Sequence, residues 1–98
     1  MLSKELVTNK PGFVYILQSE VNSRFYVGST MDVEKRFNEH QNGNVRFTRN
    51  IRPLQLKFFT KLDNIKKARQ MEYRLKKLKS REIIERIIQE QDIRLKLD

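Results

Sequence analysis

The feature that most constrains the fold is a short apolar run near the N-terminus. Residues 13–17 read Phe-Val-Tyr-Ile-Leu, a run that is too short for a helix and rich in β-branched and aromatic side chains. Such a run predicts a buried strand. A polar turn over 19–23 follows, and residues 25–28 then read Phe-Tyr-Val-Gly. The two runs predict an antiparallel hairpin, in which Gly28 ends the second strand where the backbone needs freedom or another group comes close.

The rest of the chain predicts helices with one further strand. Val33, Phe37 and His40 share one face of a short helix, for which Thr30 or Asp32 is the expected cap. The other expected elements are a basic loop over 44–53, a strand over 54–60, a helix over 65–79 and a second helix starting at Ser80. The order β-β-α-β-α-α predicts an α+β fold, a small, mainly antiparallel three-stranded sheet flanked by helices.

The length of 98 residues predicts a single domain. We expect it to span residues 12–90, between a flexible lead-in over 1–11 and a charged tail over 91–98. No apolar run approaches the roughly 18 residues that cross a membrane, and the first residues lack a signal-peptide core. We therefore expect a cytoplasmic, nucleoid-associated monomer with no membrane partner. The absence of cysteine and the single histidine exclude disulfides, cysteine-based zinc sites and multi-histidine metal sites.

The charge of the chain indicates a polyanionic partner. The 21 Lys and Arg exceed the 12 Asp and Glu, which gives a net charge of +9. Residues 41–61 hold five basic residues and no acidic one, and residues 64–81 hold eight basic residues and only Glu72 as an acid. A solvated helix face or a membrane-surface helix would also be basic, but two consecutive runs favour a phosphate-binding surface. The candidate nucleic-acid contacts are Arg46, Arg49, Arg52, Lys76 and Lys77.

Four residues form candidate pairs for chemistry at a phosphate. Tyr15 and Tyr26 lie on facing strands of the predicted hairpin, where side chains on one face come close together. Arg36 and His40 are four residues apart and share a helix face. An arginine fork matches phosphate geometry, and an imidazole exchanges protons near neutral pH. The alternatives are two core aromatics, a surface arginine and a histidine favoured by the helix C-terminus.

Glu72 stands out because the apolar stripe of its helix assigns its position to the core-facing side. Carboxylates avoid such positions unless they are paired or bind a metal. One carboxylate with several waters is an ordinary Mg²⁺ site, and a buried ion pair with a neighbouring base is the alternative. Together with the two phenols, the guanidinium and the imidazole, this carboxylate completes the set that phosphodiester hydrolysis requires.

These motifs resemble the GIY-YIG nuclease superfamily. Val14-Tyr15-Ile16 and Tyr26-Val27-Gly28 are similar to the paired motif that names the family, and Arg36, His40 and Glu72 fall where the family keeps its other site residues. The matching segments are Gly28 to Asp32, the Arg52-Pro53 pair and Glu72 to Leu78. They resemble the small single-domain bacterial branch related to the N-terminal nuclease domain of UvrC. The resemblance covers residues 12–80.

The resemblance implies a three-stranded antiparallel sheet flanked by helices, and a role for each candidate residue. Tyr15 would orient the water or the scissile phosphate, and Tyr26 would act as general base or help activate the nucleophile. Arg36 would hold the phosphate, and His40 would assist proton transfer or substrate orientation. Glu72 would bind a single divalent cation, Mg²⁺ or Mn²⁺.

Two positions depart from the family pattern. Phe13 stands where the family name has its first glycine, and Ser29 stands where several members have a lysine. If that lysine contributes to activating water, its absence implies slower catalysis or a greater reliance on Tyr26 and His40.

We therefore expect a divalent-metal-dependent DNA endonuclease that is directed by DNA structure and linked to repair or recombination. Its substrates would be branched, flapped or nicked DNA, with a protein partner as one source of specificity. The alternative is a basic nucleic-acid-binding module that keeps the fold without turnover. A highly charged RNA-associated structural protein would also explain the charge, but not an acid at a core-facing position.

Overall fold

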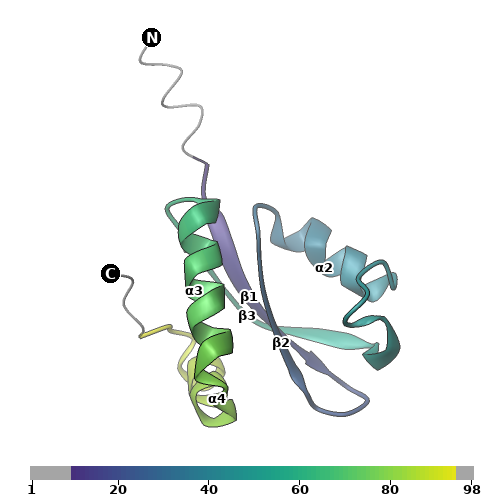
Figure 1. Cartoon of the computed structure of the whole chain (residues 1–98). Helices are drawn as coiled ribbons and strands as arrows, with labels where there is room; N and C mark the ends of the chain where they lie inside the picture. Colours follow the sequence, from purple (N-terminus) through teal and green to yellow (C-terminus); the bar gives the residue numbers. More distant parts are fainter. Residues whose placement is uncertain (1–9, 95–98) are drawn as a thin grey trace.

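The computed structural model describes residues 10–94 and has the predicted order of elements (Figure 1). The elements are β1 (Gly12–Ser19), β2 (Phe25–Thr30), α2 (Val33–Gln41), β3 (Leu54–Leu62), α3 (Ile65–Leu78) and α4 (Arg81–Glu90). The α+β fold is thus confirmed, and each strand extends beyond its apolar run. Most of the lead-in over 1–11 and half of the tail over 91–98 lie outside the described residues. Within the described range, no helix is long and apolar enough to cross a membrane.

Strand β1 is the central strand of the sheet and contributes buried side chains to both faces. The order is β2-β1-β3, and both neighbours of β1 run antiparallel to it. Because side chains alternate along a strand, Val14 and Ile16 point to one face, and Tyr15 and Leu17 point to the other. All four side chains are almost fully buried.

The main hydrophobic core lies between the sheet and helices α3 and α4, which cover one face while α2 lies across the other (Figure 1). Val14 and Ile16 pack there against Ala68, Met71 and Leu75 of α3. The side chains of Asn64 and Ser80 cap α3 and α4 by accepting hydrogen bonds from backbone N–H groups of their first turns.

A smaller cluster fills the opposite face beneath α2. It consists of Tyr15, Leu17 and Leu54, with Phe37 and Ile51 packed against them. Of the two expected caps, Asp32 is the N-cap of α2, and its carboxylate accepts from the backbone N–H of Lys35 at 3.0 Å. This second cluster carries the phenols, so the packing of α2 determines their surroundings.

The segment over 44–53 is a loop as predicted, and within it Val45 and Thr48 are buried and Arg49–Ile51 form a short 3₁₀ turn. One expectation needs correction. The core-facing stripe of α3 runs through Ala68, Met71 and Leu75, so Glu72 lies beside the stripe and is only partly buried. A shift of one residue around the helix moves a side chain about 100°, from the core to its border.

Candidate active site

The two phenols lie on the α2 face of the hairpin. Tyr15 pairs with Gly28 across the strands, and Leu17 pairs with Tyr26, so the two tyrosines are diagonal neighbours. Their ring centroids are 6.4 Å apart. The imidazole of His40 stands against both rings, at 5.7 Å from Tyr15 and 5.1 Å from Tyr26. The structure therefore brings three of the five predicted catalytic side chains into one cluster.

Gly28 makes room for the Tyr15 hydroxyl. A Cβ atom at residue 28 would lie 2.3 Å from Tyr15 Oη, well inside van der Waals contact. The glycine expected at a close approach of another group is therefore found there. Any larger residue would displace the phenol from its position.

His40 is fully buried at the C-terminal end of α2 and uses both ring nitrogens. Its Nε2 shares a hydrogen bond with the Tyr15 hydroxyl at 2.9 Å, and its Nδ1 shares one with the Thr48 hydroxyl at 2.7 Å. A neutral imidazole carries one N–H, on either Nε2 or Nδ1. If Nε2 takes the proton of Tyr15, Nδ1 therefore has to give its own proton to Thr48 for the ring to stay neutral. Because it is buried, His40 reaches a substrate only through its partners.

The surroundings keep this chain of hydrogen bonds uncharged at neutral pH. Burial raises the pKa of Tyr15 to about 12, which outweighs the opposite effect of the neighbouring Arg36 guanidinium. Burial also lowers the pKa of His40 to about 4, and the positive charge of Arg36 acts in the same direction. Tyr15 is therefore a neutral phenol and His40 a neutral imidazole.

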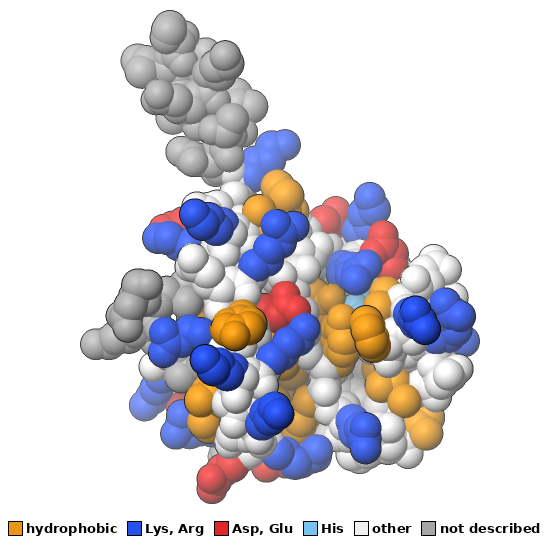
Figure 2. All heavy atoms as spheres, viewed as in Figure 1, with side chains coloured by type: hydrophobic (Ala, Val, Ile, Leu, Met, Phe, Trp, Pro, Cys, Tyr) orange, Lys and Arg blue, Asp and Glu red, His pale blue; other side chains and the backbone are white. Residues whose placement is uncertain are grey.

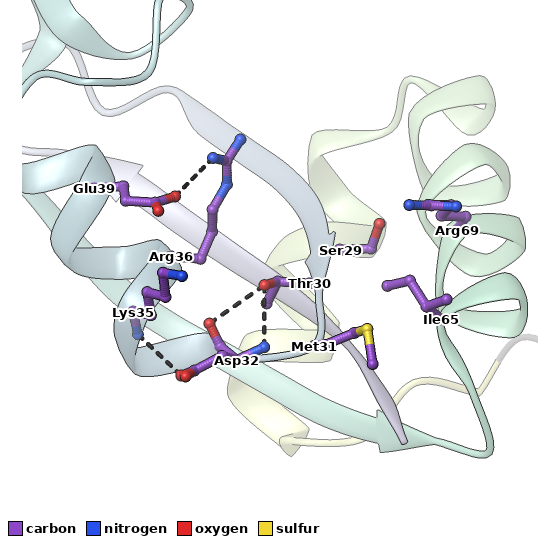
Figure 3. A pocket seen from close by; sticks show the side chains of 9 residues that line it. All are labelled: Ser29, Thr30, Met31, Asp32, Lys35, Arg36, Glu39, Ile65 and Arg69. Carbon is purple, nitrogen blue, oxygen red and sulfur yellow. Dashed lines mark hydrogen bonds and ion pairs between the residues drawn. The ribbon is translucent and has the colours of Figure 1, made fainter. Parts of the chain in front are cut away.

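Arg36 lies one helical turn before His40 and borders a hollow of about 390 Å³ between α2 and α3. Figure 3 shows this hollow, with Arg36 and Glu39 on the α2 side and Arg69 on the α3 side. The guanidinium donates to Glu39 at 2.9 Å, and this hydrogen bond raises the pKa of Arg36 above its usual range. Arg36 is therefore a permanent positive charge beside the phenols.

Glu72 lies on α3, next to the edge strand β2. Ser29 Oγ donates to its Oε1, and Lys76 Nζ donates to its Oε2. The Glu72 side chain is 20% exposed, so water reaches it. Lys76 also lies over the ring of Tyr26, with Nζ 5.7 Å from the ring centroid. The ion pair expected as the alternative is thus present, and it connects the carboxylate to the phenol cluster.

Strand β2 separates the two halves of the site. Tyr26 belongs to its α2 face, whereas Ser29 contacts Glu72 of α3. The guanidinium, phenols and imidazole thus lie on one side of an edge strand, and the carboxylate lies on the other. Lys76 links the two halves, because it contacts both the Glu72 carboxylate and the ring of Tyr26.

A metal at this place would rely on Glu72 and water. In the chain from residue 10 to 94, no three His, Cys, Asp or Glu side chains lie close enough to hold an ion together. A single accessible carboxylate with water fits Mg²⁺ or Mn²⁺, which retain much of their hydration. Lys76 would have to release its carboxylate oxygen, and its own side chain is 49% exposed.

The predicted nucleic-acid contacts divide between two places. Lys76 and Lys77 lie on α3 beside Glu72, whereas the three arginines lie in the loop after α2. Figure 2 shows basic side chains over both regions, with hydrophobic side chains between them. All five are exposed, so both regions present positive charge to solvent.

The model of the GIY-YIG catalytic domain matches residues 11–85. The chain belongs to the GIY-YIG family. The match includes both tyrosines, Arg36, His40 and Glu72, and it ends within α4.

Bacterial relatives of this GIY-YIG protein are similar over most of its length. The UPF0213 protein CPE1444 of Clostridium perfringens is 39% identical over 67 residues, covering 67% of this chain and 71% of that protein. The UPF0213 protein YhbQ of Escherichia coli is 36% identical over 73 residues, covering 74% and 72%. The solution NMR structure of the UPF0213 protein BH0048 from Bacillus halodurans has a TM-score of 0.51 at 30% identity, covering 81% and 83%.

Sequence reasoning missed Thr48 of this GIY-YIG protein. Thr48 is fully buried and holds Nδ1 of His40, although it lies in a basic loop without apolar periodicity. Ser29 was noted only as a departure from the family, and it is a hydrogen-bond donor to Glu72. The signal available for Thr48 was a short β-branched residue among arginines, which is too common to single out.

Proposed function

We propose that this chain is a divalent-metal-dependent DNA endonuclease that hydrolyses phosphodiester bonds in nicked, flapped or branched DNA. The observation that carries the proposal is the cluster of Tyr15, Tyr26 and His40, which Lys76 links to the Glu72 carboxylate on the other side of β2. Its family membership and basic surface support a nucleic-acid substrate. The inferred context is DNA repair or recombination, with a protein partner adding specificity.

In this proposal, Arg36 and Tyr15 position the scissile phosphate. The Arg36 fork keeps N–H groups beyond the one that Glu39 accepts, and these bind phosphate oxygens. Tyr15, with its pKa raised to about 12, stays protonated and acts as a hydrogen-bond donor or orients a water. Both groups stabilise charge that develops on the phosphate during hydrolysis.

Tyr26 and His40 divide the handling of protons. Tyr26 is half-buried at the edge of the sheet, so it is the phenol that a water reaches, and it is the proposed base or activator of that water. His40 acts through Tyr15, because its imidazole is fully buried and hydrogen-bonded to that hydroxyl. His40 therefore fixes the orientation of Tyr15 and receives or returns the phenol proton.

Glu72 is the proposed holder of Mg²⁺ or Mn²⁺, because it is the partly exposed carboxylate at this edge. When bound, such an ion polarises the phosphate and stabilises the leaving oxygen. Ser29, which donates to Oε1, orients the carboxylate from the other side.

The test is cleavage of nicked, flapped, branched and plain duplex DNA by the wild type and by Glu72→Ala, with and without Mn²⁺. We expect Glu72→Ala to abolish metal-dependent cleavage while the thermal unfolding midpoint stays close to that of the wild type, because Glu72 lies outside the buried stripe of α3 and its partner Lys76 is exposed. Glu85→Ala is the matched control, since Glu85 forms an exposed pair with Arg81 on α4. Unaltered cleavage by Glu72→Ala would sink the assignment.

The contact of both Glu72 oxygens with Ser29 and Lys76 favours one alternative, a binding module without turnover. That module would bind DNA with strong salt dependence and yield no metal-dependent product. Neutralising about five phosphates would give a log–log slope of about −4 to −5. Binding without cleavage on all four DNA forms would establish this alternative.

A further inference from the structure

We propose that the loop over 42–53 is a binding site for an unpaired nucleotide, in which Phe47 stacks on the base and Arg49 and Arg52 hold a phosphate. This inference rests on the proposed action on DNA and deepens it by naming the part of the substrate that the loop recognises. Three observations carry it: the exposure of Phe47, the order of the loop, and a hollow formed by the two arginines.

Phe47 is exposed to solvent, although the loop has buried residues on both sides of it. Its side chain is 79% exposed, the highest value among the exposed large hydrophobic residues, whereas Val45 is 6% and Thr48 0% exposed. The backbone N–H of Thr48 donates to the Val45 carbonyl at 3.2 Å, and that of Ile51 donates to the Thr48 carbonyl at 3.1 Å. A loop with buried residues on both sides of Phe47 presents the ring outward in a defined position.

Single exposed hydrophobic residues are common and need no ligand. Phe47 differs because it stands within the acid-free stretch over 41–61, directly after Arg46 and two residues before Arg49. The arginines beside the ring repel positively charged surfaces and attract polyanions. A nucleobase is the flat partner that a nucleic acid offers to the ring. Aromatic rings with flanking positive charge are the usual means of binding unpaired bases.

Arg49 and Arg52 line a hollow of about 350 Å³ together with Gln41 and Pro53, and none of the four is acidic. Both guanidinium groups are braced by the backbone. Arg49 Nε donates to the Gly43 carbonyl at 3.0 Å, and Arg52 Nε donates to the Arg49 carbonyl at 2.8 Å. Arg52 Nη1 also donates to the Gln41 carbonyl at 3.4 Å. The other outer N–H groups of the two arginines remain for a phosphate, and little side-chain freedom is left to lose on binding.

Gly43 is required for this arrangement. Its φ of +82° favours glycine, and a Cβ atom there would lie 2.6 Å from Nη1 of Arg52. Gly43 therefore both follows the C-terminal end of α2 and leaves the space that the Arg52 guanidinium occupies.

The nucleotide site is coupled to the phenol cluster through Thr48. The residue after Phe47 hydrogen-bonds to His40, which hydrogen-bonds to Tyr15. A base stacked on Phe47 is thereby held at a fixed offset from the Tyr15 hydroxyl. This arrangement gives preference for DNA with an unpaired base near the scissile bond, without any reading of sequence.

The test is equilibrium binding in EDTA, where metal-dependent cleavage is absent, to a flapped duplex and to a plain duplex of equal length. The flap carries the fluorescent adenine analogue 2-aminopurine, whose emission is quenched by stacking. We expect Phe47→Leu to weaken binding to the flap about tenfold and to remove the quenching, as loss of one stacked base would. Phe47→Trp is expected to retain both the flap affinity and the quenching. Binding of either variant to the plain duplex is expected to change less than twofold.

Val21→Ala is the control, because Val21 is an exposed hydrophobic residue in the β1–β2 turn, outside the loop. Thermal unfolding midpoints of the variants equal to that of the wild type exclude a folding effect. Arg49→Gln and Arg52→Gln are expected to reduce the salt slope of flap binding by about one each. Unchanged slopes would overturn the phosphate part of the proposal.

Flap affinity and quenching that survive Phe47→Leu, or equal weakening on both DNA forms, would overturn the base-stacking part. These outcomes are separate from the fate of the nuclease proposal. If the wild type shows quenching that depends on Phe47 but never cleaves DNA, the nucleotide site is supported and the nuclease proposal is overturned. If the wild type cleaves DNA and Phe47→Leu changes neither binding nor quenching, the nuclease proposal is supported and the nucleotide site is overturned.

Discussion

The two sides of strand β2 hold their polar groups in opposite ways. On the α2 side, Tyr15, His40 and Thr48 form a closed chain of hydrogen bonds in which each residue is at most 2% exposed. On the α3 side, Glu72 is reached by water, and Lys76, which pairs with it, is 49% exposed. One side is fixed by burial, and the other is free to exchange partners.

This difference indicates a division of labour. A buried polar chain has one low-energy arrangement, because breaking any of its bonds leaves an unpaired group in the interior. An exposed ion pair contributes little to stability and gives way to a competing ligand at small cost. The α2 side is therefore suited to holding a fixed geometry, and the α3 side has the freedom to exchange partners that the proposed cation site requires.

The largest expected effect compares the neighbours Gly28 and Ser29, which serve opposite sides of β2. Gly28→Ala places a Cβ atom 2.3 Å from Tyr15 Oη, so the phenol must move and its bond to His40 breaks. We expect a loss of about 3 kcal/mol in the free energy of unfolding, measured by urea denaturation. Ser29→Ala removes only a hydroxyl at a carboxylate that water reaches and is expected to lose less than about 1 kcal/mol. Equal losses of stability in the two variants would contradict the proposed difference between the buried α2 side and the α3 side of β2.

The second prediction concerns acid and the buried side. The pKa of His40 is about 4 in the folded chain and near 6.5 when unfolded, so the unfolded chain binds a proton that the folded chain does not. Stability is therefore fully present above about pH 6.5 and falls as the pH drops toward 4, by on the order of 2 kcal/mol.

The measurement is the urea midpoint at steps from pH 7 to pH 4.5. His40→Gln is expected to show a flatter profile over this range, because it lacks the titrating group. Its carboxylates are the same as those of the wild type, so the difference between the two profiles isolates His40. Parallel profiles would show that the imidazole titrates normally.

The smallest expected effect on stability comes from Lys76→Met, on the exposed side. Loss of this ion pair, whose Lys76 side chain is exposed, changes the free energy of unfolding by less than about 0.5 kcal/mol. Glu72 Oε2 is freed, and removal of the positive charge strengthens Mn²⁺ binding about fivefold, measured by isothermal titration calorimetry. Lys77→Met is the control, because the Lys77 ammonium lies over the Tyr73 ring. Weaker or unchanged Mn²⁺ binding in Lys76→Met would place the ion elsewhere.

The fold was predictable because local patterns and tertiary packing agree. The apolar run over 13–17, the polar turn and the returning run specify the hairpin, and Asp32 and Ser80 mark helix starts as caps. The internal geometry of the sheet was less accessible. The pairing of β1 with β3 shifts between Ile16 and Leu17, so that Ile16 pairs with Phe58 but Leu17 with Leu56. No local pattern of β3 marks such an irregularity.

Part of the site was predictable for the same reason. The i, i+4 spacing placed Arg36 and His40 together, and the hairpin placed the two tyrosines on one face. The prediction that Glu72 faces the core was wrong, because the sequence of α3 fits an apolar stripe through either Glu72 or Met71, and the buried stripe runs through Met71. Thr48 depends on the path of a loop back toward His40, and loop paths are set by tertiary contacts.

The two-faced role of β1 has a consequence for how the chain can change in length. Val14 and Ile16 pack in the main core, while Tyr15 and Leu17 pack on the α2 face. One residue inserted within β1 would therefore turn every following side chain of the strand to the opposite face of the sheet. The turn over 20–24 lies outside both strands, so we expect an insertion there to leave the alternation of side chains along β1 unchanged. The interval from Tyr15 to Tyr26 can therefore lengthen or shorten in the turn, while each tyrosine keeps its distance to its own strand end.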